Sequence, residues 1–390
     1  MSFEQRLPVE FYHRVQQDVL QRMQADGDRA AVFDHPDDVA YLTGFFHHAG
    51  ERPVAVHLDG SGAVLLLPEL EREHAEWQEA AAELVSYPEF PGIRSPWAYL
   101  ADSVAEPERL AMSESMSIGR RRQLGRLWPT ATMVTTSALS EARLRKHPEE
   151  IALHAEAARI TDLMIEAGIG LIRAAAEAGR EFPSEAELAR EVAACGTSTM
   201  YAEHRDVVVV GLLAGGLVYA GANSAKPHGL PSGYRLRPGD TFMLSLGCAV
   251  GGRYVEGERT FILGEPNRDQ VRYYEAVRRA QQTGIDAIRP GLSCAESNRL
   301  CLDVLREAGL AQYLRHRQGH GIGIGMHEPP WLEDGDSTTL EAGFVVSNEP
   351  GIYVPGHAGY RISDSMLVTA EGARPFTGYP KALDDIVIDI

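Results

Sequence analysis

Apolar and polar positions along the first 145 residues follow two different periods. From Val9 to Ala25 apolar residues recur every three to four positions, which predicts an amphipathic helix. The next stretch, RAAVFDHPDDVAYLTGF, predicts an apolar strand, a turn and a second helix. In RPVAVHLDGSGAVLLLPEL two apolar runs flank a turn at residues 59–62, which predicts a β-hairpin. Strands and helices alternate to about Ser140, so this part is predicted to be a mixed α/β domain.

The pattern changes after Lys146. Pro148 is a first-turn signal, and the apolar stripe of Ile160, Met164 and Leu171 predicts one long helix. A chain of 390 residues is long enough for two domains with separate cores. We therefore predict an N-terminal domain over residues 1–145 and a C-terminal domain over residues 146–390.

The C-terminal part contains two similar segments. LRPGDTFMLSLG begins at Leu236 and LEAGFVVSNEPG at Leu340, and predicted helices precede each of them. Both run from Leu through Gly into a short β-rich stretch and a Ser. This order predicts an α+β domain with an internal pseudo-twofold repeat, whose functional site lies at the seam between the halves.

The charge and the cysteines narrow the range of partners. Lys and Arg number 37 against 55 Asp and Glu, a net charge of -18, which disfavours nucleic acid and anionic membrane surfaces. No run of 18 apolar residues occurs, the amino terminus has no apolar signal-type core, and the four cysteines form no C-x-x-C pair. We predict a cytoplasmic protein with reduced cysteines.

Two groups of polar residues suggest chemistry. His316, His320 and His327 lie in the glycine-rich run RHRQGHGIGIGMHEPP, where the backbone can approach a ligand closely. In RYVEGERTF, Glu256 and Glu258 are two residues apart, so on a strand both carboxylates leave the same face. Two such carboxylates repel unless a cation or a proton lies between them, which suits acid/base work or the binding of a positive group.

Together with SNEPGIY and GYRISDSMLVT, the histidine run resembles the pita-bread hydrolase family of aminopeptidase P, prolidase, methionine aminopeptidase and creatinase. DDVAYLTGF and ERPVAV resemble the N-terminal domain of creatinase and prolidase, RKHPEEI their domain junction, and AGANSAKPHG their catalytic-histidine loop. The resemblance covers nearly the whole chain. It implies a creatinase-like α/β domain followed by a pita-bread domain, and a homodimer.

In the peptidases of this family, two Asp, one His and two Glu hold two metal ions. The matching positions here are Ser245, Glu256, His320, Glu349 and Ser363. Two ions close together need bridging carboxylates to offset their repulsion, and a neutral hydroxyl replaces one bridge. The resemblance therefore implies no normal dinuclear centre. We predict no cofactor, or at most one divalent ion held by Glu256, His320 and Glu349.

Part of the site resembles creatinase, which works without metal and also has Ser-Leu and E-R-T in this hairpin. By this resemblance His228 is the acid/base histidine, Glu258 and Glu349 bind or polarise the substrate, and Arg52 holds its carboxylate.

Other residues resemble prolidase and aminopeptidase P. There the histidine matching His327 contacts the scissile peptide group, and the arginine matching Arg361 supports the metal shell. We assign His228, Glu258, His327 and Glu349 to catalysis. We assign four further residues to substrate binding: Arg52, Tyr254, His316 and Arg361.

Three functions stay open at this point. The first is an Xaa-Pro-peptidase-like hydrolase that cleaves a C–N bond in a small carboxylate-bearing substrate or short peptide without the dinuclear centre. The second is a metal-independent, creatinase-like amidinohydrolase acting on a cationic guanidine. The third is a non-catalytic peptide-binding protein. The sequence does not distinguish cleavage at the amino end from cleavage at the carboxy end.

Overall fold

The computed structural model describes residues 3–390, which divide into two compact units. The N-terminal unit contains residues 6–143 and 208–211. The C-terminal unit contains residues up to 5, then 144–207 and 212–390. The sequence pattern gave no sign of the two short segments, 3–5 and 208–211, that lie in a unit apart from their chain neighbours. Within residues 3–390 no helix has the length and apolar character needed to cross a membrane.

The N-terminal unit is built on a six-stranded mixed sheet in the order β5-β4-β3-β2-β6-β7. The strands are β2 (Ala30–Phe33), β3 (Ala55–Asp59), β4 (Gly62–Pro68), β5 (Glu83–Tyr87), β6 (Arg109–Ser113) and β7 (Thr132–Thr136). β3 and β4 form the predicted antiparallel hairpin, and Asp59 pairs with Gly62 across its turn. The helices are α1 (Val9–Ala25), α2 (Pro36–Thr43), α3 (Arg72–Trp77), α4 (Pro96–Ser103), α5 (Ile118–Leu127) and α6 (Ala138–Leu144).

Local sequence signals explain these elements. α1 has the predicted bounds, and its buried side chains recur at helical spacing. α2 begins at Pro36 and ends at Thr43, before Gly44, whose φ of 76° is the left-handed conformation that glycine adopts readily at a helix end. The alternating side chains of the strands build the core on one face of the sheet, together with Trp97 of α4 and Leu124 of α5.

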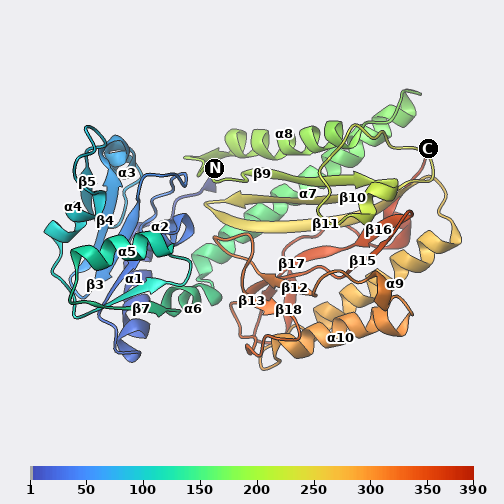
Figure 1. The fold of residues 1–390 in the computed structure, drawn as a ribbon. Coiled ribbons are helices and arrows are strands. Elements are labelled where there is room, and N and C mark those ends of the chain that lie inside the picture. Colours follow the sequence, from blue (N-terminus) through green and yellow to red (C-terminus); the bar gives the residue numbers. More distant parts are fainter. Residues whose placement is uncertain (1–2) are drawn as a thin grey trace. The chain divides into compact units, whose positions relative to one another are not determined.

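The C-terminal unit repeats one arrangement twice. Helices α7 (Pro148–Glu177) and α8 (Glu185–Glu203) precede β9 (Ala214–Ala220), β10 (Thr241–Val250) and β11 (Arg253–Leu263). Helices α9 (Arg268–Ala287) and α10 (Cys294–Glu307) precede β12 (Gly319–Gly321), β13 (Glu328–Leu332), β14 (Val345–Asn348) and β17 (Ser363–Val368). Figure 1 shows α7 and α8, in green, along β9 to β11, which they contact.

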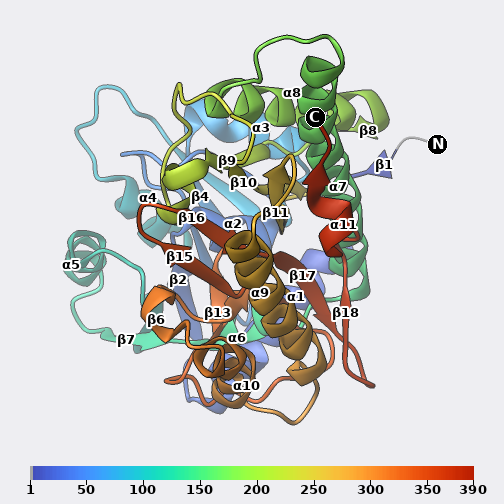
Figure 2. The same ribbon diagram turned by 90° about the vertical axis from the view of Figure 1, so that its right-hand side faces the viewer.

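The two halves join in one sheet, in the order β13-β12-β14-β17-β11-β10-β9. The seam is the antiparallel pair of β11 and β17, where Glu258 lies opposite Ser363. Helices α9 and α10 pack against each other, and α9 contacts β14 of the second half. Figure 2 shows α9 and α10 next to each other. The expected two-domain α+β class is confirmed, and the seam brings the candidate residues of both halves together.

Shorter elements complete this unit. β15 (Gly351–Val354) and β16 (Ala358–Arg361) form a separate hairpin that places Tyr353 and Arg361. β1 (Phe3–Glu4) pairs with β8 (His204–Arg205), β18 (Ala373–Pro375) with β17, and β19 (Val387–Ile388), after α11 (Leu383–Ile386), with β11. Three cysteines are buried and Cys195 is half-buried, and all four are free thiols.

Candidate active site

A cavity of about 900 Å³ opens within the C-terminal unit. Its wall includes eight residues singled out in the sequence: His228, Glu256, Glu258, His316, His320, His327, Glu349 and Arg361. Leu212, Leu217 and Met326 add apolar surface, and Arg315, Arg317 and Glu333 add charge. This volume suits a small molecule or a short peptide.

The β10–β11 hairpin supplies the cavity floor. Its register places Ser245 opposite Glu258 and Gly247 opposite Glu256, so the two carboxylates leave one face as predicted. Gly247 cannot carry a side chain, because a Cβ there would lie 2.4 Å from the Val255 carbonyl oxygen. The Glu258 side chain reaches from β11 across to β10, where it accepts a hydrogen bond from the Ser245 hydroxyl.

Glu258 and Arg361 form a buried ion pair, with 5% of each side chain exposed. Arg361 Nη2 donates to Glu258 Oε1 at 2.7 Å and to Ser245 Oγ at 2.9 Å, and the Ser245 hydroxyl in turn donates to Glu258. Burial raises the pKa of Glu258 to about 7; Arg361 opposes this shift, while Glu256 and Glu349 add to it. The Glu258 carboxylate already has a cationic partner inside the protein.

His316 and Tyr353 hold Arg361 from its other side. His316 Nδ1 donates to the Arg317 carbonyl at 2.8 Å, so its Nε2 accepts from the Tyr353 hydroxyl, also at 2.8 Å. Arg361 Nη1 then donates to the Tyr353 oxygen at 2.9 Å. Burial lowers the pKa of His316, which keeps this imidazole neutral. Both ring nitrogens of His316 therefore make hydrogen bonds, and His316 orients Arg361 through Tyr353. The sequence analysis did not single out Tyr353.

His320 lies between two carboxylates. Its Nδ1 contacts the Gly321 carbonyl oxygen at 3.0 Å, which aims Nε2 at Glu349 Oε1, 3.4 Å away, and Glu256 Oε2, 3.6 Å away. Nε2 is buried and makes no hydrogen bond within residues 3–390. Burial lowers the pKa of His320, but Glu256 and Glu349 outweigh it and raise this pKa to about 10. Two carboxylates around one imidazole nitrogen suit either a proton on that nitrogen or a metal cation bound to it.

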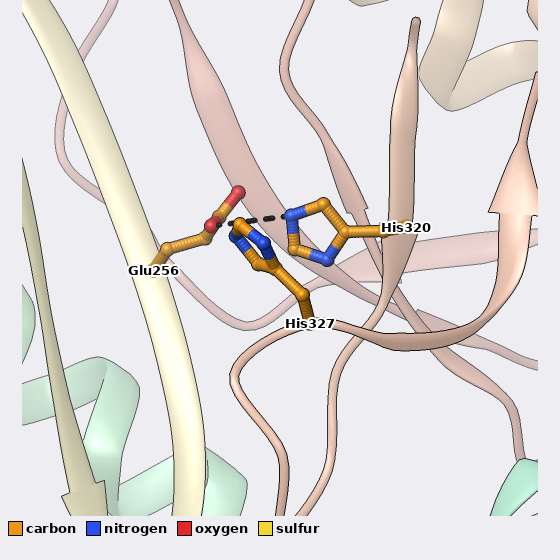
Figure 3. A group of neighbouring side chains, drawn as sticks. All are labelled: Glu256, His320 and His327. Carbon is orange, nitrogen blue, oxygen red and sulfur yellow. Dashed lines mark ion pairs between the residues drawn. The ribbon is translucent and has the colours of Figure 1, made fainter. Parts of the chain in front are cut away.

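His327 joins this group. Its ring centroid lies 4.0 Å from that of His320, and burial and the His320 charge lower its pKa. Glu256, His320 and His327 offer ligand atoms that all lie within 4.8 Å of one another. Figure 3 shows the three side chains converging from β11, β12 and the loop before β13. Sequence reasoning had placed His327 against the substrate and had not grouped it with possible ligands.

The donor set around His320 fits a divalent ion. Two carboxylates with one or two imidazoles are adequate for a single ion such as zinc. The two serines next to this set offer only hydroxyls: Ser245 is engaged by Glu258 and Arg361, and Ser363 donates to Glu256 Oε1 at 2.8 Å. A second ion would face neutral hydroxyls and the Arg361 guanidinium.

Asp364 fixes the seam behind the site. This side chain is fully buried and accepts hydrogen bonds of 2.6–2.7 Å from four residues: Arg259, Gln281, Thr377 and Lys381. Burial raises its pKa, but Arg259 and Lys381 outweigh this effect and lower the pKa to about 2. Sequence reasoning passed over Asp364, although R-T-F and S-D-S offered complementary charges on adjacent strands.

Two predicted residues do not lie on the cavity wall. Tyr254 shares the strand face of Glu256, but it packs against the buried cluster of Ile322, Val345 and Leu367. Arg52 belongs to the N-terminal unit, where its guanidinium forms ion pairs with Glu51 and Glu89 and 47% of its side chain is exposed. The substrate-binding roles given to both remain predictions.

Comparisons with known proteins agree with this architecture. Residues 152–370 match the model of metallopeptidase family M24, and residues 14–146 match the creatinase/prolidase N-terminal domain. The Xaa-Pro dipeptidase of Lactobacillus helveticus is 29% identical over 95% of this chain and 99% of its own.

Two solved structures are similar over almost their whole length. Dipeptidase PepE from Mycobacterium ulcerans has a TM-score of 0.84 and 29% identity, covering 99% of this chain and 100% of its own. The Xaa-Pro dipeptidase from Bacillus anthracis has a TM-score of 0.84 and 26% identity, covering 97% and 100%. The chain is therefore a hydrolase of C–N bonds that belongs to metallopeptidase family M24 and carries that family's creatinase/prolidase N-terminal domain.

Proposed function

We propose that this protein is a dipeptidase-type hydrolase that cleaves the C–N bond of a small carboxylate-bearing substrate, such as an Xaa-Pro dipeptide, with a single divalent ion. The observation that carries this proposal is the geometry of His320, whose buried Nε2 lies between Glu256 and Glu349. The similarity to the Xaa-Pro dipeptidases and to dipeptidase PepE supports the substrate class.

Glu256, His320 and Glu349 would hold the ion, with the His327 imidazole within reach. An ion bound there would supply Lewis-acid polarisation of a carbonyl and a water of lowered pKa. The sequence alone favoured a metal-free site over this one. The geometry favours one ion, because the ligand atoms of Glu256, His320 and His327 lie within 4.8 Å of one another and Glu349 Oε1 lies 3.4 Å from His320 Nε2.

The chain's own side chains would supply proton transfer and orientation. His228 is exposed on the cavity wall and would carry a proton to the leaving nitrogen, worth about 10²- to 10⁴-fold in rate. The lowered pKa of His327 keeps its imidazole neutral at pH 7, so it can donate one hydrogen bond to the peptide group. Glu258 is catalytic only indirectly in this proposal, because it fixes Arg361.

The amidinohydrolase alternative requires Glu258 to receive a guanidinium from the substrate. In the structure the guanidinium of Arg361 is already ion-paired with that carboxylate, and only 4% of Glu258 is exposed. A cationic substrate would have to displace a buried ion pair. This observation ranks the peptidase-type reaction first, and no observation favours a purely binding role.

Hydrolysis assays test the proposal. The chelator-treated protein is assayed with Ala-Pro, an Xaa-Pro tripeptide and creatine, before and after addition of Mn²⁺ or Zn²⁺. We expect ion-dependent cleavage of Ala-Pro that falls at least 100-fold in the His228→Ala and His320→Ala variants, while exposed His13→Ala stays at the wild-type rate. Creatine hydrolysis without metal, or no turnover of any substrate, would contradict the proposal.

The cytoplasmic location and the homodimer belong to this proposal as expectations. Light scattering on the purified protein should give twice the 42.7 kDa of one chain. A mass of one chain would contradict the homodimer.

A further inference from the structure

The loop that carries His228 lies between β9 and β10. No hydrogen bond of the His228 ring within residues 3–390 holds this loop in place. Pro227 and His228 lie on the cavity wall, and the His228 imidazole has no hydrogen-bond partner among residues 3–390. Its position therefore depends on the backbone of residues 221–231. The contacts that fix the backbone of this loop therefore determine the position of the His228 imidazole in the cavity.

Glu185, the first residue of α8, holds both ends of this loop. Its side chain is fully buried. Oε1 accepts from the Ala220 backbone N–H at 2.7 Å and from the Asn223 amide at 3.1 Å. Oε2 accepts from the Ser232 backbone N–H at 2.9 Å and from the Ser232 hydroxyl at 2.6 Å. One carboxylate thus closes the segment between residues 220 and 232 into a fixed loop.

The surroundings favour a charged acceptor at this position. Glu185 lies in the first turn of α8, where the partial positive charge of the helix terminus stabilises a carboxylate. The loop is further tied by Tyr219, whose hydroxyl donates to the Pro227 carbonyl at 2.8 Å. Ser224 Oγ accepts from Gly359 N at 2.9 Å, and a Cβ on Gly359 would lie 2.0 Å from the Ser224 carbonyl oxygen.

We infer that Glu185 is a positioning residue for His228: its carboxylate sets the reach of the imidazole into the cavity without contacting the substrate. The inference rests on the role proposed above for His228. Glu185→Gln keeps the shape but turns one acceptor oxygen into an amide donor that faces two donors. A shift of about 1 Å in a reacting group costs on the order of 100-fold in rate.

The test compares Glu185→Gln with Glu187→Gln, a change on the same helix turn at the capping-box residue, which contacts Ser184 and Arg235. For Ala-Pro cleavage we expect Glu185→Gln to lower kcat about 100-fold with KM within about threefold, and Glu187→Gln to leave kcat unchanged. Ser232→Ala removes one of the four bonds and should lower kcat less, in the same direction. Hydrogen exchange at residues 221–231 should quicken in Glu185→Gln and stay at the wild-type rate in Glu187→Gln.

A double-mutant cycle separates positioning from general structural damage. In the His228→Ala background, Glu185→Gln should cost no further activity, because the group that it positions is gone. An equal loss of kcat in both backgrounds, or a wild-type kcat in Glu185→Gln, would overturn the inference. If the wild-type protein cleaves no dipeptide, the proposed function fails instead, and unchanged exchange of residues 221–231 in Glu185→Gln would still overturn the inference.

Discussion

Replacing Asp364 by Asn tests how far the seam between the two halves depends on one buried charge. Asp364 faces Arg259, which is 1% exposed, and Lys381, which is 26% exposed. A pKa lowered from 3.8 to about 2 corresponds to roughly 2 kcal/mol of stabilisation of the ionised form in the folded state. Asn would also turn an amide N–H₂ toward donors, so the full cost should reach about 3–5 kcal/mol.

Differential scanning calorimetry of the full chain measures this cost. At about 2–4 °C per kcal/mol, the transition of the C-terminal unit should fall by roughly 6–20 °C at pH 7. Asp303→Asn, which breaks an exposed pair with Arg306, should change it by less than about 2 °C.

The pH dependence of the same measurement has a definite sign. Because the pKa of Asp364 is lower in the folded state, its contribution is full above pH 3.8 and disappears as the pH falls toward 2. The difference between Asp364→Asn and wild type should therefore shrink below about pH 4. A loss under about 1 kcal/mol at pH 7, or a difference that grows with acidity, would refute the reasoning.

Three further predictions follow from the site and the core. The pKa of His320 is raised to about 10, so an ion must displace its proton and the affinity for the ion should rise from pH 7 to 9. Titration calorimetry in two buffers should show about one proton released per bound ion. If no proton is released, His320 is not a ligand. Burial lowers the pKa of His154 to about 3, so below pH 6.5 the unfolded chain binds more protons than the folded one, and the free energy of unfolding should fall by up to about 1.4 kcal/mol per pH unit toward pH 4. Calorimetry of His154→Gln should show a smaller slope. An unchanged slope would contradict this prediction. If Arg52 holds the substrate carboxylate, Arg52→Gln should raise KM about tenfold at constant kcat, and Arg94→Gln, an exposed ion-paired arginine of the same unit, should leave steady-state kinetics unchanged; equal effects would remove Arg52 from the site.

The sequence predicted the elements well where one local signal decides them. The helix at Val9–Ala25 and the hairpin at residues 55–68 depend on neighbouring residues, through helical or alternating periodicity and a tight turn. The alternation of β11 also predicted correctly that Glu256 and Glu258 share one face. These patterns need no knowledge of distant parts of the chain.

Position along a strand was harder to predict. Alternation assigned Tyr254 to the same face as Glu256, but it lies two residues, about 7 Å, further along the strand. There the face meets the buried cluster of Ile322, Val345 and Leu367, and no longer the cavity. A period of two gives the side of a sheet and says nothing about where a cavity ends.

Two long-range pairings could not be predicted from the residues near either partner. Glu258 and Arg361 are 103 residues apart, and nothing near either of them signals that the guanidinium takes up the carboxylate. The same holds for Glu185 and Ser232, 47 residues apart. The partners of such buried charges can be identified only when the sheet register and the helix packing are known.

We propose that one divalent ion binds between Glu256, His320 and Glu349, and that the buried Glu258–Arg361 pair beside them leaves no free carboxylate for a second ion. The most direct measurement is the metal content of the protein by mass spectrometry, after reconstitution with excess Mn²⁺ and removal of unbound ion. The account predicts one ion per chain, lost in His320→Ala. Two ions per chain in the wild-type protein, or none, would contradict it.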